Sequence, residues 1–198
     1  MFSKSALKIT DYLVQNRIIS ESDSEIYSFG FKAGFAMLAN IAITLAIGVI
    51  MGMLLESLLM LAIFVPLRSC AGGVHASNNI KCLLLSVIAV FLVLIMAREA
   101  SGFFNDTLIF IIGVVCSIII FILAPVQDAN KPLNKDDCKV LKRRSLKALC
   151  IELSLFLMLL YLGFKTATIV FILTLSLTCL SVCIGALKNY WLYSVNTR

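Results

Sequence analysis

The chain alternates between long apolar runs and short polar breaks, and this pattern predicts the fold. The second apolar run is short, with Glu56 near its start and Pro66 near its end, so it must borrow flanking residues or stay partly re-entrant, because a span needs about 20 residues. We expect an all-α, polytopic membrane protein with about six transmembrane helices. The runs cover about residues 31–53, 54–67, 80–97, 107–126, 148–164 and 166–187.

The first 30 residues have a different pattern. Apolar residues such as Leu7, Leu13 and Ile18 recur at roughly helical spacing between charged ones. This predicts an amphipathic helix at the membrane surface, with a solvated helical lead-in to the first span as the alternative. No short apolar core followed by a cleavage site is present, so we expect no secretory signal peptide.

The whole chain, 1–198, is expected to form one membrane domain. Its parts are the interfacial helix 1–30, a six-helix region 31–187 and, inside that region, a basic loop 127–147. With 61% hydrophobic and only 14% charged residues, the chain is far from the composition of a soluble domain, which has roughly a quarter charged residues.

The net charge of +6 indicates membrane sidedness rather than nucleic-acid binding. If the 127–147 loop is cytoplasmic and the chain has six spans, all 17 basic residues except Arg98 and Lys165 lie on the cytoplasmic side. Cytoplasmic loops of membrane proteins carry this excess of Lys and Arg. We therefore expect both termini and the polar break around residues 68–82 at the cytoplasmic face.

Seven cysteines are present, but none forms a CxxC pair. Cys116, Cys179 and Cys183 lie well inside apolar runs and Cys150 lies near the start of one; there a cysteine behaves as a small buried hydrophobe. We expect no structural zinc and, more generally, no metal and no organic cofactor. We find no internal repeat typical of inverted-repeat transporters and no phosphate-binding loop.

The polar break between the second and third runs holds the only histidine, His75, and Cys82 seven residues later. With Ser77 or Asn78 as the helix N-cap, Cys82 lies in about the first turn of the third span, where backbone N–H groups and the helix dipole favour a thiolate. In one continuous helix His75 would be about 10 Å away along the axis. Proton transfer needs about 3 Å, so the Gly72-Gly73 turn must fold His75 back toward Cys82.

These residues suggest attack of a thiolate on an acyl carbon, with His75 as base and then acid. Arg68, Lys81 and free backbone N–H groups are candidates to stabilise the oxyanion or to bind a substrate carboxylate. The alternative is that Cys82 is a buried apolar cysteine and His75 a solvated loop residue. Cys70 is a rival nucleophile, weaker because it precedes the glycines and no helix start follows it.

The arrangement Arg-x-x-x-Gly-Gly-x-His-Ala from Arg68, followed by Cys82, resembles the AgrB family (accessory gene regulator protein B) of bacterial membrane cysteine endopeptidases. The segment Ala124-Pro125, the later Asn-Lys-Pro-Leu and the basic run to Lys147 resemble the polar loop of that family between its fourth and fifth spans. The resemblance covers essentially the whole chain. Val74 departs from it, since many relatives carry an aromatic residue there, and this makes the substrate's identity less certain.

The resemblance implies that Cys82 is the nucleophile and His75 its partner, with functional weight on Arg68 and Gly73. It also implies that the basic loop determines peptide processing. The residues expected to bind or support the substrate are Arg68, Gly72, Gly73, Lys81, Lys131, Lys142, Arg143 and Arg144.

The implied substrate is an AgrD-like propeptide with an acidic C-terminal tail, processed in a bacterial cell membrane for quorum sensing. The implied reaction cleaves the tail, holds the peptide as a thioester on Cys82 and yields a cyclic lactone or thiolactone. The alternatives are a peptide transporter, which would need paired ionisable groups inside spans, and a non-catalytic membrane chaperone of a signal peptide. A homodimer is left open, and no nucleic-acid partner is expected.

Overall fold

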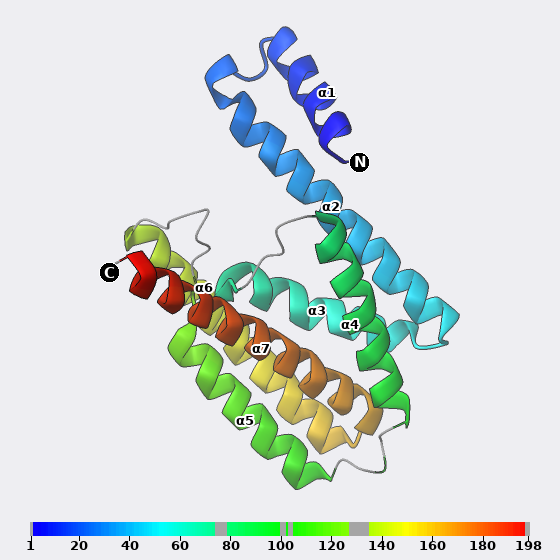
Figure 1. Cartoon of the computed structure of the whole chain (residues 1–198). Helices are drawn as coiled ribbons and strands as arrows, with labels where there is room; N and C mark the ends of the chain where they lie inside the picture. The colour runs from blue at the N-terminus through cyan, green and yellow to red at the C-terminus, as the bar shows by residue number, and fades with distance from the viewer. Residues whose placement is uncertain (1, 74–78, 100–101, 103–104, 127–134, 197–198) are drawn as a thin grey trace.

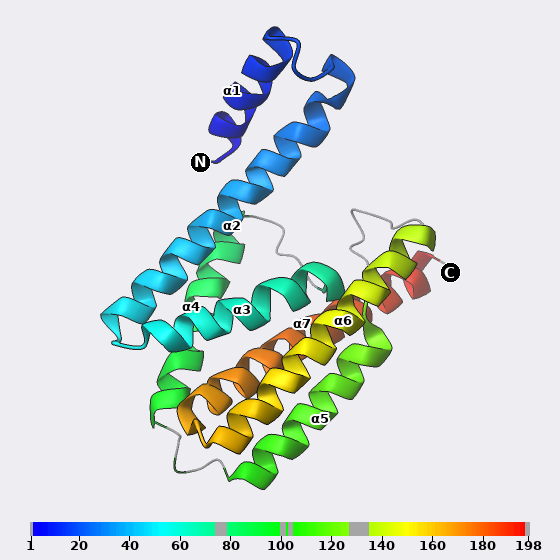
Figure 2. The ribbon, with the colours of Figure 1, turned by 180° about the vertical axis from the view of Figure 1, so that it is seen from behind.

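The chain folds into helices in a computed structural model that describes residues 2–73, 79–99, 102, 105–126 and 135–196. Six of the helices are long and apolar enough to cross a membrane, and one helix precedes them. The predicted fold class is therefore confirmed (Figures 1 and 2). The elements are α1 (Phe2–Gln15), the 3-10 turn η1 (Glu21–Asp23), α2 (Ser24–Ile50), α3 (Leu54–Ala71), α4 (Asn79–Glu99), α5 (Asp106–Leu123), α6 (Lys135–Leu162) and α7 (Lys165–Asn196).

The short second run gains its length at its C-terminal end. It forms α3, which continues through Pro66 to Ala71 and reaches 18 residues. A turn at Gly52, with φ +68°, separates α3 from α2. α3 therefore borrows flanking residues, which was one of the two alternatives expected for this short run. It packs obliquely across α6 and α7 (Figures 1 and 2).

Two expected boundaries are corrected. The 1–30 segment is not one helix, because α1 ends at Gln15 and the first long helix already begins at Ser24. The 127–147 segment is not all loop, because its part from Lys135 onward forms the first turns of α6. Lys, Arg, Leu and Ala are strong helix formers. The acidic side chains of Asp136 and Asp137 in the first turn also interact favourably with the positive end of the helix dipole.

The core forms around α7. In its most apolar stretch 56% of the residues of α7 are buried, against 11% in the corresponding stretch of α2. α7 contacts α3, α4, α5 and α6. In its first half the Phe171 ring packs on Phe156 of α6, with ring centroids 5.1 Å apart. A Cβ atom at Gly113 of α5 would lie 3.0 Å from Phe156, so the small residue lets α5 approach this pair closely.

The first turn of α6 and the last turns of α5 and α7 lie at one end of the α5–α7 bundle, opposite the α6–α7 turn, whereas α4 begins beside α2, away from them (Figures 1 and 2). The C-terminal end of α3 reaches the same end, where it contacts α7. The Gly72-Gly73 turn and the basic start of α6 thus lie toward the same end of the bundle.

Candidate functional site

The Gly72-Gly73 turn ends α3. The φ angles are +72° at Gly72 and +122° at Gly73, in a region that L side chains rarely adopt. A Cβ atom at Gly72 would overlap the carbonyl oxygen of Val126, and one at Gly73 would overlap the Arg68 guanidinium. Gly72 therefore requires glycine for space as well as for conformation, because the overlap is with backbone. At Gly73 the overlapping atom ends a flexible side chain, and the backbone conformation is the stronger requirement.

The residues that follow α5 hold this turn from one side. The Val126 N–H donates a hydrogen bond of 2.8 Å to the Ala71 carbonyl, and Val126 forms an isolated parallel bridge with Gly72. Val126 is buried. The end of α3 and the chain after α5, more than 50 residues apart in the sequence, are thus joined backbone to backbone.

α7 closes the other side of the turn. A Cβ atom at Gly185 would lie 3.0 Å from Gly73 Cα and 3.0 Å from Val126 Cγ1. One α-helical turn earlier, the Ser181 side chain borders the space above Gly73. Small residues at positions 181 and 185 let α7 approach the turn this closely, and sequence reasoning did not identify them; their four-residue spacing in the last span is the signal that was available.

Arg68 lies in the last turn of α3 and curls over the turn. Its Nη1 donates a hydrogen bond to the Gly72 carbonyl. That carbonyl is one of the groups left without a helical partner at the end of a helix. The Arg68 side chain therefore contacts the turn directly.

Cys82 is the fourth residue of α4 and carries a free, half-buried thiol. The prediction that it lies in the first turn of this helix is confirmed. Its carbonyl accepts a hydrogen bond of 2.9 Å from the Ser86 hydroxyl. His75 and the expected N-cap, Ser77 or Asn78, lie outside the described residues, and so does the predicted fold-back of His75.

The rival Cys70 also carries a free, half-buried thiol, in the last turn of α3. The negative end of a helix dipole disfavours a thiolate, whereas the first turn that contains Cys82 favours it. Helix position therefore favours Cys82 over Cys70 as the nucleophile.

The basic residues of α6 have different surroundings. The Lys142 ammonium donates hydrogen bonds to the carbonyls of Ala124, at 2.7 Å, and Phe121. Arg143 and Arg144 are exposed. Lys81 belongs to the first turn of α4, but its side chain lies outside the described residues, as does all of Lys131.

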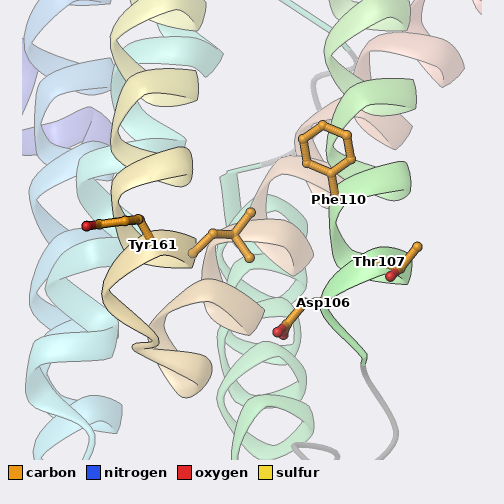
Figure 3. Close-up of a pocket in the computed structure, with 5 residues that line it drawn as sticks. Asp106, Thr107, Phe110 and Tyr161 are labelled. Atoms are coloured by element: carbon orange, nitrogen blue, oxygen red, sulfur yellow. The ribbon is translucent and has the colours of Figure 1, made fainter.

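A shallow hollow at the opposite end of the bundle is lined by the start of α5 and the end of α6. Figure 3 shows Asp106 and Thr107 on α5, while the Tyr161 hydroxyl points away from that helix. Tyr161 is 90% exposed. This hollow lacks the close backbone contacts of the Gly72-Gly73 turn, and we do not assign chemistry to it.

Other potential functional groups are sparse. Within the described residues, no group of three His, Cys, Asp or Glu side chains is arranged to hold a metal ion. Glu152 of α6 is only 5% exposed, and neither carboxylate oxygen finds a hydrogen-bond partner in the part of the chain that the structure describes. Two ion pairs, Arg98–Glu99 and Lys139–Asp136, join exposed side chains.

Comparison with known proteins identifies the family. The model for accessory gene regulator B matches residues 6–185. An AgrB-like protein 2 of Clostridium perfringens (strain 13) is 31% identical over 154 residues, which cover 71% of each chain. FsrB of Enterococcus faecalis (strain OG1RF) is 28% identical over 138 residues, which cover 69% of this chain and 55% of FsrB. No solved structure matches. The chain is therefore a multi-pass membrane protein of the accessory gene regulator B family, which takes part in quorum sensing.

Proposed function

We propose that this protein is a membrane cysteine endopeptidase that processes an AgrD-like propeptide, with Cys82 as nucleophile and His75 as its proton-transfer partner. The observation that carries the proposal is the position of Cys82. Its free thiol lies in the first turn of α4, directly after the polar break that begins with the Arg68-braced Gly72-Gly73 turn. Backbone N–H groups at a helix start stabilise a thiolate.

In the first step, the Cys82 thiolate attacks the carbonyl carbon at the scissile peptide bond. The C–N bond breaks, the C-terminal tail leaves as an amine that takes a proton from His75, and the peptide remains on Cys82 as a thioester. In the second step, an internal thiol or hydroxyl of the peptide gives its proton to His75 and attacks the thioester carbon. The ring closes as a thiolactone or lactone, and the Cys82 thiolate is released.

The remaining groups have supporting roles in this proposal. Arg68, Lys81 and the backbone N–H groups near Cys82 stabilise the developing oxyanion or bind a substrate carboxylate. The exposed Arg143 and Arg144, with Lys131, attract the acidic tail of the propeptide. A site at the membrane edge also limits water, so that the thioester cyclises instead of being hydrolysed.

We place the site, both termini and the basic start of α6 at the cytoplasmic face. The positive-inside distribution of Lys and Arg supports this orientation. The basic start of α6 and the C-terminal end of α7 lie at the same end of the bundle, as this orientation requires (Figure 1).

Mass spectrometry of the full-length protein incubated with an AgrD-like propeptide tests the proposal. We expect an acyl adduct on Cys82 and release of the tail in wild type, and neither product in Cys82→Ala or His75→Ala. Cys70→Ala is the matched control, because it removes the other free thiol near the turn, and it should retain both products. Cleavage that survives Cys82→Ala would overturn the assignment of the nucleophile.

A second variant, Cys82→Ser, and the surroundings of Glu152 separate the alternative functions. A non-catalytic chaperone would tolerate Cys82→Ser, whereas the proposed peptidase loses processing. A transporter would need paired ionisable groups deep in its spans. The carboxyl group of Glu152 in α6 is buried but has no hydrogen-bond partner in the described part of the chain, which argues against a transporter.

A further inference from the structure

Lys142 binds the protein itself. Its ammonium donates hydrogen bonds to the carbonyls of Ala124 and Phe121, at the C-terminal end of α5, and lies 5.2 Å from the centroid of the Phe121 ring. The end of a helix leaves carbonyl groups without helical partners and carries partial negative charge. A lysine ammonium can donate hydrogen bonds to these carbonyls and carries the opposite charge, so Lys142 of α6 caps the C-terminal end of α5.

Its neighbours on α6 are arranged differently. Arg143 is exposed, and Lys139 pairs with Asp136 on the surface at 3.3 Å. The Lys142 ammonium is therefore hydrogen-bonded to two carbonyls of the protein, whereas the side chain of the next residue, Arg143, is exposed. This difference separates Lys142 from the residues proposed to attract the substrate tail.

The carbonyl that Lys142 binds is close to the candidate site along the chain. Ala124 precedes Val126 by two residues, and Val126 is hydrogen-bonded to Ala71 and bridged to Gly72. We propose that Lys142 is a positioning residue that, by capping α5, holds Val126 against the Gly72-Gly73 turn. The consequence for catalysis rests on the proposed function.

Loss of the ammonium should loosen this connection locally. In Lys142→Met the side chain keeps similar length, but the cap is lost, and the segment around Val126 opens more readily. The matched control is Arg143→Met, which removes a charge from the next residue, where the side chain is exposed. Lys142→Arg restores a cation and should recover much of the wild-type behaviour.

Hydrogen–deuterium exchange of the full-length protein in detergent measures the connection without any substrate. We expect amides in the peptide that contains Val126, and those at residues 71–73, to exchange about tenfold faster or more in Lys142→Met, as for loss of one charge-assisted hydrogen bond. α7 should stay protected, which shows that the variant is folded. Unchanged exchange at Val126 in Lys142→Met, or an equal acceleration in Arg143→Met, would overturn the proposal.

Processing kinetics then distinguish positioning from substrate binding. Lys142→Met should lower kcat about 10- to 100-fold, as for a misplaced reacting group, with KM within about twofold of wild type. A raised KM with unchanged kcat would make Lys142 a substrate contact and overturn the proposal. If exchange changes as expected but wild type processes no propeptide, the proposed function fails while the role of Lys142 in holding the turn is supported.

Discussion

Each end of the α5–α7 bundle has a turn that contains a glycine with a positive φ angle, but the surroundings of the two glycines differ. Gly72, after α3, and Gly163, between α6 and α7, both have φ +72°. A Cβ atom at Gly163 would meet nothing within 4 Å, whereas one at Gly72 would overlap the Val126 carbonyl. The Gly163 turn only connects two helices, while the Gly72 turn is fixed by its neighbours. Crowded backbone that admits one geometry is what a site needs to hold reacting groups in place.

Alanine at each glycine gives the sharpest test of this difference and the largest expected effect. Gly163→Ala should cost about 1–2 kcal/mol of stability, from the left-handed conformation alone, and leave propeptide processing near wild type. Gly72→Ala carries a larger conformational cost, because φ +72° with ψ −147° lies in a region essentially restricted to glycine. It must also displace Val126, so processing should fall about 100-fold or more. Propeptide cleavage and thermal unfolding in detergent measure the two effects.

The result for Gly72→Ala is informative only if the protein still folds, which unfolding measurements on both variants establish. Equal losses of processing at the two glycines would contradict the comparison. They would mean that the crowding around Gly72 has no functional weight beyond the turn itself.

The sequence predicted the spans and the place of Cys82 because both depend on local information. Apolar runs and their lengths set the six helices, and a polar break before an apolar run sets a helix start. The charged run at the start of α6 indicates a loop by its polarity alone, but Lys and Arg are good helix formers, and the segment is helical.

The surroundings of the turn could not be predicted in the same way. The Val126–Gly72 bridge, the approach of Gly185 to Gly73 and the Lys142 cap join residues distant in the sequence. Such contacts depend on how the helices cross, and hydrophobic periodicity does not encode this. The sequence predicts the same substrate-binding role for Lys142 as for Arg143 and Arg144, because it shows that Lys142 is charged but not what it contacts.

Reversing the charge of basic residues should affect substrate binding moderately at one end of the bundle and not at the other. Replacing Arg143 and Arg144 by glutamate should raise KM for a propeptide with an acidic tail several-fold, since exposed ion pairs contribute about 0.2–1 kcal/mol each. The effect should shrink as salt is added, because exposed charges are screened. KM measured at low and high ionic strength, with kcat nearly unchanged, checks this prediction.

The matched control is Lys165→Glu, an exposed basic residue at the start of α7, at the opposite end of the bundle. It should leave KM unchanged at either salt concentration. A comparable rise in KM there would show that overall charge, and not the basic start of α6, attracts the substrate.

The smallest effect on processing is expected between the two ends, at Glu152. Its carboxyl group is 5% exposed and finds no hydrogen-bond partner among the described residues, so burying it costs free energy that an apolar side chain would not. Glu152→Leu should therefore raise the free energy of unfolding by about 1–3 kcal/mol, seen as a higher midpoint of thermal unfolding in detergent. Processing should stay near wild type in Glu152→Leu and in the isosteric Glu152→Gln. If both variants stayed folded but stopped processing, essential chemistry would extend into the middle of the bundle, and the contrast between a reactive end and a merely connecting end would fail.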